Sequence, residues 1–186
     1  MCSSDLNSRF KTIEELIAAS KDKPLNWGVS QIGGTEHVGL ARFAKAAGIK
    51  FKVVPFGSGA QMVQALMAGA IDATLPNVSE AGSQVQEGTF RALAVMAPRR
   101  LKDYPDVPTT FDNNYKVKVS TTRGYWVLSG TPMDRVEILS KAMVKAMKHE
   151  TFAAYLKSAG LSVEDSVAGH KVWTENIREE YVQAVG

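Results

Sequence analysis

The sequence has one cysteine, three histidines and no dense run of like charge among its 186 residues. A single cysteine, Cys2, excludes an internal disulfide and any zinc site built from several cysteines. The three histidines are scattered and match no recognised metal-ligand spacing. We therefore expect neither a metal site nor any other cofactor.

The net charge is also small, since the chain has 22 lysines and arginines and 19 aspartates and glutamates. Nucleic-acid binders usually carry a stronger and clustered positive charge, and the nearest candidate, residues 99–102, is predicted to be a solvated loop. No apolar run approaches the length of a membrane span, and no apolar leader precedes Cys2. We expect a soluble chain without signal peptide, membrane insertion or nucleic-acid partner.

Short apolar segments alternate with helical patterns in the first half of the chain. The predicted strands cover residues 25–30, 50–55, 71–75 and 90–96, and the helices between them cover 35–47, 59–68 and 78–88. A helix from about residue 13 precedes them, with a Thr12–Glu15 capping box. This alternation predicts an α/β fold with a doubly wound, mostly parallel sheet.

The two ends of the chain follow a different pattern. Residues 1–10 are polar and without periodicity, so we expect a loose head. After a long surface connection at residues 98–114, residues 125–128 are the one strong strand candidate before three helices, at 132–148, 151–158 and 169–184. One strand is little for three amphipathic helices to pack on, which indicates a lobe whose beginning is missing.

The segment Asn26-Trp27-Gly28-Val29-Ser30-Gln31-Ile32-Gly33-Gly34-Thr35-Glu36-His37 is the most informative part of the sequence. It predicts a strand, a glycine-rich turn and a helix that opens at Thr35. The first N–H groups of a helix have no intrahelical acceptor, and the helix dipole is positive at that end. Such a turn can hold a carboxylate or phosphate, although it can equally serve only to reverse the chain.

Two further strand-to-helix turns fall at the same edge of a parallel sheet, so we expect all three to face one crevice. The candidate ligand-binding residues are Ser30, Gly33, Gly34, Thr35, His37, Phe56, Gly57, Ser58 and Asn77. Ser58 and Asn77 could instead only cap helices, and His37 could only bind a neighbouring loop. Phe56 could close over an aliphatic ligand or pack in the core.

Seven segments, taken in order, resemble the substrate-binding proteins of tripartite tricarboxylate transporters, the Bug family. They are residues 26–30, 33–37, 54–58, 66–73, 88–95, 104–109 and 124–132. The resemblance runs from about Lys11 to the C-terminus. It implies a type II, periplasmic-binding-protein-like architecture of two lobes, here with one lobe complete and the other partial.

The resemblance also implies a function and a domain organisation. Family members are periplasmic receptors that hold a small carboxylate, such as a dicarboxylate or tricarboxylate, between the lobes and pass it to a membrane permease. Residues 11–123 would form the second lobe and residues 124–186 the C-terminal portion of the first. Residues 1–10 would be a disordered or foreign head, because the family's signal peptide and glycine-rich first-lobe loop have no counterpart before Lys11.

Two other function classes share this kind of fold. The effector domain of a transcription regulator would be accompanied by a helix-turn-helix, and no such module with a basic recognition helix precedes the sheet. An enzyme would need acid–base or metal-binding residues at the turns, which are uncharged apart from Asp72 and His37. A Gly-x-Ser-x-Gly nucleophile elbow is also lacking, so we expect no catalytic residues and no enzyme.

Overall fold

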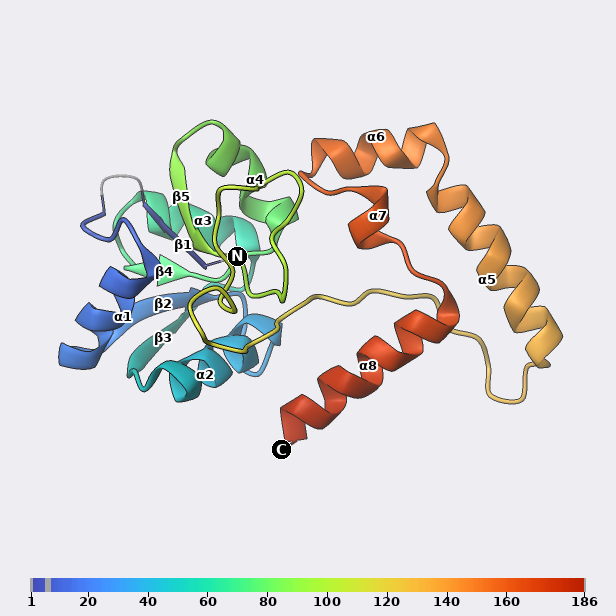
Figure 1. Ribbon diagram of the computed structural model, residues 1–186, viewed down its shortest axis with the longest axis horizontal. Coiled ribbons are helices and arrows are strands. Elements are labelled where there is room, and N and C mark those ends of the chain that lie inside the picture. Colours follow the sequence, from blue (N-terminus) through green and yellow to red (C-terminus); the bar gives the residue numbers. More distant parts are fainter. Residues whose placement is uncertain (1, 6–7, 186) are drawn as a thin grey trace. The chain divides into compact units, whose positions relative to one another are not determined.

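The computed structural model describes residues 2–5 and 8–185, and its contacts divide the chain into two compact units. Unit 1 is Met1–Ser120 and unit 2 is Thr121–Gly186 (Figure 1). The sequence placed a boundary between residues 123 and 124. The assignment of the units to two lobes of a receptor remains a prediction.

Unit 1 is built on a five-stranded sheet with the order β3-β2-β4-β1-β5. The strands are β1 Cys2–Asp5, β2 Leu25–Val29, β3 Phe51–Pro55, β4 Ala73–Thr74 and β5 Phe90–Ala94. Strand β2 pairs in parallel with β3 and β4, whereas β1 is antiparallel to β4 and β5. The predicted α/β fold with a mostly parallel sheet is therefore confirmed.

Strand β1 lies in the segment that the sequence predicts to be a loose or foreign head. Ser3 pairs with Thr74 of β4, and Asp5 pairs with Phe90 of β5. The expectation of a loose or disordered segment is wrong for Cys2–Asp5, because main-chain hydrogen bonds on two sides fix an inner strand without any apolar periodicity, whereas a foreign origin of the head stays a prediction. Residues 1, 6 and 7 of the predicted head lie outside the described residues.

Four helices cover the sheet of unit 1: α1 Ile13–Asp22, α2 Thr35–Ala47, α3 Gly59–Met67 and α4 Val78–Gln86. The start of α1 follows from its capping box, in which the Thr12 hydroxyl accepts from the Glu15 N–H at 3.3 Å and the Glu15 carboxylate accepts from the Thr12 N–H at 3.4 Å. Helix α2 ends at Gly48, whose φ of 64° is a left-handed conformation that glycine adopts without strain.

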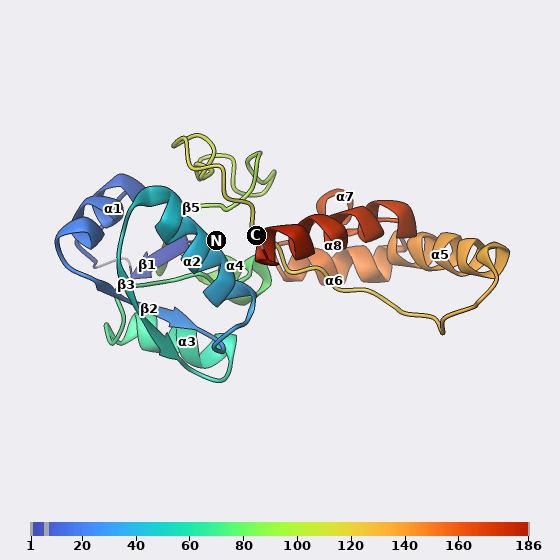
Figure 2. The ribbon, with the colours of Figure 1, turned by 90° about the horizontal axis from the view of Figure 1, so that it is seen from below.

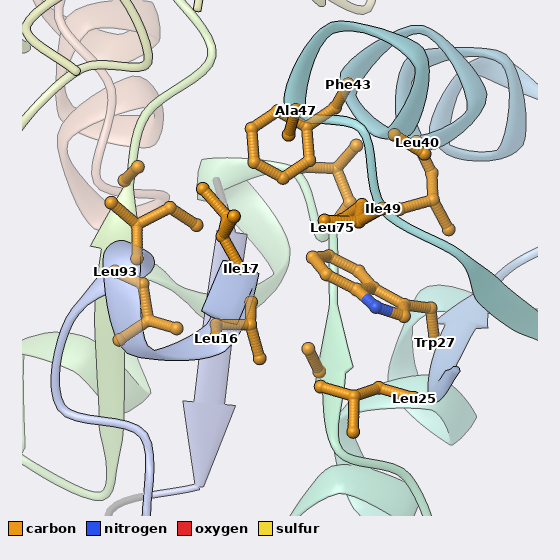
Figure 3. Close-up of a cluster of buried hydrophobic side chains, with 14 of the residues drawn as sticks. Leu16, Ile17, Leu25, Trp27, Leu40, Phe43, Ala47, Ile49, Leu75 and Leu93 are labelled. Atoms are coloured by element: carbon orange, nitrogen blue, oxygen red, sulfur yellow. The ribbon is translucent and has the colours of Figure 1, made fainter. Parts of the chain in front are cut away.

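One face of the sheet packs against α1 and α2. Leu25, Trp27 and Val29 alternate along β2 and are all buried, as a strand with one face toward a core requires. Trp27 lies in a cluster with side chains of α1 and α2, including Leu16 and Phe43 (Figure 3). This cluster is the larger of the two cores.

The opposite face packs against α3 and α4. Met62 and Leu66 of α3 are fully buried and form a second cluster with Ile71 and Phe90. Gly28 of β2 faces this cluster, since a Cβ there would lie 2.5 Å from Ile71 Cδ1 and 2.9 Å from Met62 Cγ. Helices α1 and α3 thus lie on opposite sides of the strands, which is the doubly wound arrangement (Figure 2).

The predicted surface connection at residues 98–114 forms turns that fold back on the sheet. Val95 bridges Thr109, and the Val119 N–H donates to the Met96 carbonyl at 3.0 Å. Within it, the Asp112 carboxylate accepts from the Thr109 N–H at 2.9 Å and from Arg100 Nε at 3.1 Å. These two hydrogen bonds lower the pKa of Asp112 below its ordinary value of 3.8, and the bond from Thr109 has the larger effect.

Unit 2 contains the helices α5 Met133–Met147, α6 Glu150–Ser158, α7 Val163–Ser166 and α8 His170–Val185. The strand predicted at residues 125–128 is wrong, because these residues belong to no strand or helix. Leu128 is 86% exposed, and Trp126, also exposed, lies edge-on to Trp173 with ring centroids 4.8 Å apart. The described part of unit 2 offers no strand edge on which this segment could pair.

Apolar side chains of unit 2 are largely exposed. Leu156 is the one buried hydrophobic residue among those described in this unit, whereas Ile138 and Leu139 of α5 and Tyr181 of α8 are exposed. In the described part of the chain, the helices are all too short or too polar to cross a bilayer.

Candidate functional site

The candidate site consists of the three turns that follow β2, β3 and β4, at one edge of the sheet. Because these strands are parallel, their carboxyl ends meet at that edge. The first two turns are bonded directly, since the Phe56 N–H donates to the Val29 carbonyl at 3.0 Å and the Gly57 N–H donates to the Ser30 carbonyl at 2.8 Å. The structure therefore brings the predicted turns together.

In the turn between β2 and α2, the N–H groups of both glycines donate to nearby residues of the chain. Gly33, at a φ of +80°, donates to Nδ1 of His37 at 2.9 Å, and Gly34 donates to the Gln31 carbonyl at 3.3 Å. The main-chain bonds of α2 begin with the Val38 N–H, which donates to the Gly34 carbonyl at 3.0 Å. The N–H groups ahead of it, on residues 35–37, have no acceptor within the helix and are the donors left for an anion.

Residues 33–35 are accessible at this edge, because Gly33 and Thr35 are exposed and Gly34 is half-buried. Helix α2 thus opens toward solvent at its positive end, as the sequence predicts. Gly33 and Gly57, at φ values of 80° and 73°, occupy backbone conformations that suit glycine.

Ser30 and Glu36 form a pair that the sequence does not predict. The Ser30 hydroxyl donates to the Glu36 carboxylate at 2.8 Å, and Glu36 is only 9% exposed. A buried carboxylate is costly unless it accepts hydrogen bonds, so this bond helps to hold Glu36 in place. Ser30 itself is half-buried between the strand end and the helix.

Ser58 and Asn77 both occupy N-cap positions, which favours the capping alternative. The Ser58 hydroxyl accepts from the Gln61 N–H at 3.3 Å at the start of α3. The Asn77 N–H and its side-chain amide donate to the Glu80 carboxylate at 2.9 and 3.1 Å. Ligand contact by either side chain remains a prediction. Phe56 is half-buried and packs on the α3–α4 core, as its packing alternative requires.

Two carboxylates therefore lie at the turns, and the prediction of turns uncharged apart from Asp72 and His37 is wrong. Glu36 is buried beside Ser30, and Glu80 also contacts the start of α3, where a Cβ on Gly59 would collide with its carboxylate. Asp72 lies at the amino end of β4 and accepts from the Asn26 N–H at 2.8 Å. The capping-box spacing of Asn77 and Glu80 could have revealed one of these acids.

Other parts of the molecule offer less for a ligand. A cavity of about 640 Å³ in unit 2 is lined by residues of α5 and of the start of α8, including Lys141, Lys145 and His170, but by no predicted site residue. Its neighbouring helices leave apolar side chains uncovered, so we place the candidate site in the well-packed unit 1. Among the described residues, no cluster of three or more histidines, cysteines or acids could hold a metal ion.

Comparison with known families decides the affiliation. Residues 4–179 match the model of the tripartite tricarboxylate transporter family receptor. The chain belongs to this receptor family. A UPF0065 protein from the tcbD-tcbE intergenic region of Pseudomonas sp. (strain P51) is 28% identical over 159 residues, which are 83% of this chain and 47% of that protein. The chain thus spans about half the length of the relatives it matches.

Solved structures agree with this affiliation. The chain superposes on a TctC solute-binding protein from Polaromonas with a TM-score of 0.82 at 25% identity, over 98% of this chain and 63% of that one. The periplasmic binding protein BugD gives 0.80 at 20% identity, over 98% and 62%. The R. palustris protein Rpa4515, solved with adipate, gives 0.74 at 20% identity, over 100% and 61%. The last two comparisons show the shared fold alone. The family model that matches this chain describes receptors and not transcription regulators.

Proposed function

We propose that this chain carries a ligand-binding site of a periplasmic solute receptor, which captures a small carboxylate for a tripartite tricarboxylate transporter. The observation that carries the proposal is the exposed start of α2 at the edge where three strand-to-helix turns meet, in a chain of this receptor family. The membrane permease as partner and the periplasm as location belong to the same proposal. Dicarboxylates and tricarboxylates are the ligand class, and the adipate of the Rpa4515 structure is one such acid.

Main-chain donors provide the chemistry for this role. The N–H groups of Thr35, Glu36 and His37 point out of the first turn of α2, where the helix dipole adds positive charge. Hydrogen bonds to a charged carboxylate are about twice as strong as those between neutral groups. Such donors recognise the carboxylate whatever carbon skeleton it is attached to, and neighbouring side chains must then select among acids.

Amide chemical shifts of the 186-residue chain, followed by NMR during titration, test the proposal at named atoms. Succinate and adipate should shift the amide resonances of Thr35, Glu36 and His37 in a saturable way. Succinamide, which has the same skeleton without charge, should shift them little, and AMP tests a phosphate ligand. Saturable shifts with AMP but not with the two acids would contradict the proposal, as would shifts confined to α5 and α8.

A further inference from the structure

The cavity of about 640 Å³ in unit 2 is lined by no residue of the three turns, but it has the size of a ligand site. It lies between helix α5 and the start of α8, which meet where the His170 N–H donates to Oγ of Ser140 at 3.2 Å (Figure 1). Pockets for small molecules usually have volumes of about 300–1,000 Å³. A small molecule therefore fits between these two helices.

Positive charge dominates the lining of this cavity. Its charged residues are Glu137, Lys141, Lys145, Lys148 and Lys171. Glu137 is already paired, because its carboxylate lies 3.8 Å from Nζ of Lys141. Within the described part of the chain, none of the other three lysines forms an ion pair, and all three are exposed. The four lysines thus outnumber the single glutamate and leave the cavity with an excess of positive charge.

The spacing of the lysines on α5 concentrates this charge. Lys141, Lys145 and Lys148 stand at positions i, i+4 and i+7, so they follow one another at intervals of about one turn along one face of the helix. Lys171, in the first turn of α8, lines the same cavity. Like charges one turn apart repel each other, so an anion between them would relieve this repulsion in addition to forming new contacts.

Phosphate suits this lining better than carboxylate does. A phosphate group carries a charge of about −1.5 to −2 at pH 7 and has three acceptor oxygens, so one group can contact several ammonium groups at once. A carboxylate has a single charge and two oxygens. Val144 and Val172 also line the cavity and offer apolar surface to an uncharged part of the ligand. The lining therefore indicates an organic phosphate, and the three unpaired lysines can accommodate more than one phosphate group.

We propose that the cavity between α5 and α8 is a second ligand-binding site, which holds an organic diphosphate from solution. Lys145, Lys148 and Lys171 contact the phosphate oxygens, and Val144 and Val172 contact the rest of the molecule. The inference goes beyond the proposed function and does not depend on it, since the start of α2 takes no part in this site.

Titration of the 186-residue chain with ADP, followed by amide chemical shifts, tests the inference. ADP should shift the amide resonances of Val144, Lys145, Lys171 and Val172 in a saturable way. Adenosine, which lacks the phosphates, should leave them in place. Pyrophosphate, which lacks the organic part and buries no apolar surface, should bind about 3- to 10-fold more weakly than ADP. Succinate should bind to these residues at least about 10-fold more weakly than ADP, because its two charges are weaker partners for the lysines.

Two lysine variants and a control test whether the phosphates lie in the cavity. Lys145→Gln and Lys171→Gln each remove one ammonium group from its lining and should lower the affinity for ADP about 3- to 10-fold. Lys157→Gln removes an exposed lysine in the last turn of α6, outside the cavity, and should leave the affinity unchanged. Since all three side chains are exposed, the substitutions should preserve the fold, which the amide spectrum of each variant checks.

Several results would overturn the inference. Absence of saturable shifts in α5 and α8 with ADP would do so, as would affinities for adenosine or succinate equal to that for ADP. Equal affinities for pyrophosphate and ADP would exclude the organic part of the ligand. An equal loss in Lys157→Gln and Lys145→Gln would show an unspecific attraction to positive charge.

Two further measurements separate this site from other sources of the same chemistry. Vesicles of phosphatidylcholine with phosphatidic acid present phosphate on a lipid surface, and sedimentation of the chain with them, without binding of ADP, would replace the diphosphate by a lipid headgroup. ADP shifts confined to residues 35–37 would place the phosphate at the start of α2. If ADP binds at α5 and α8 while dicarboxylates leave residues 35–37 unchanged, the proposed function fails and this inference stands.

Discussion

The main-chain N–H of Gly33 donates to Nδ1 of His37 at 2.9 Å and so ties the turn before α2 to the first turn of that helix. An imidazole nitrogen that accepts carries no hydrogen, so the neutral ring has its hydrogen on Nε2. His37 therefore stabilises the loop whose shape exposes the start of α2. The bond agrees with the alternative that His37 only binds a neighbouring loop. Direct contact between His37 and a ligand stays a prediction.

Replacing His37 tests this relationship. His37→Ala removes the acceptor, so the Gly33 amide should exchange with solvent several times faster and the affinity for a carboxylate should fall about 3- to 10-fold, the equivalent of one hydrogen bond. His37→Asn keeps an acceptor atom near the position of Nδ1 and should retain most of both. Hydrogen exchange by NMR and calorimetry are the two measurements. An unchanged exchange rate in His37→Ala would show that the bond contributes nothing to the loop.

Ser58 provides a test of capping at the next turn. Because its hydroxyl accepts from the Gln61 N–H at 3.3 Å, Ser58→Ala should lower the free energy of unfolding by about 1 kcal/mol. Ser58→Gly should lower the free energy of unfolding by only a few tenths of a kcal/mol, since glycine is itself a good N-cap. Urea unfolding measures both. Equal losses for the two variants would argue against a capping role.

Gly28 is predicted to be indispensable for packing rather than for ligand binding. Gly28→Ala places a methyl group 2.5 Å from Ile71 Cδ1 and 2.9 Å from Met62 Cγ, in a buried core. Overpacking of this kind costs about 1–3 kcal/mol of unfolding free energy. Gly169→Ala adds a methyl group where nothing lies within 4 Å of a Cβ, so it lacks the clash and should cost at most about 1 kcal/mol, from the loss of the glycine that precedes α8. A neutral Gly28→Ala would mean that α3 can move away from β2.

Asp112 predicts a dependence of stability on pH. Hydrogen bonds from Thr109 and Arg100 hold its pKa below the ordinary value of 3.8, so the folded state favours the ionised form. The resulting stabilisation is fully present above pH 3.8 and is lost as the pH falls through the lowered pKa.

Asp112→Asn should therefore be less stable than the wild type at neutral pH, and the difference should shrink below pH 3.8. Urea unfolding at pH 7 and at several values between 4 and 2.5 measures it. Asp106→Asn changes an exposed aspartate of the same connection and serves as control. A difference that stays constant over the whole range would mean that the charge of Asp112 has no part in it.

Much of unit 1 was predictable because most of its strands and helices are determined by residues that lie close together in the sequence. The strand β2, the Thr35 start of α2 and the capping box of α1 each follow from residues that are neighbours in the sequence. Strand β1 could not be found in this way. Its residues are polar, and its place depends on backbone pairing with β4 and β5, more than sixty positions further on.

The same limit applies to the candidate site. The glycine-rich sequence drew attention to Gly33 and Gly57, and the structure places both at positive φ. The side-chain pair of Ser30 and Glu36 was missed, because a glutamate in the first turn of a helix is usually exposed and nothing in the local pattern marks it as buried. At residues 125–128 an apolar sequence predicted a strand, but a strand forms only where another edge can pair with it.

The position of β1 between β4 and β5 has a consequence for how the sheet is assembled during synthesis. Its four residues are synthesised before the edge supplied by Phe90–Ala94, which begins 85 residues after Asp5. Pairing across such a separation is slow compared with the formation of adjacent βα units. The three strands β2, β3 and β4 can join early, and β5 reaches them only through β1, so the insertion of this short segment is the step that completes the sheet.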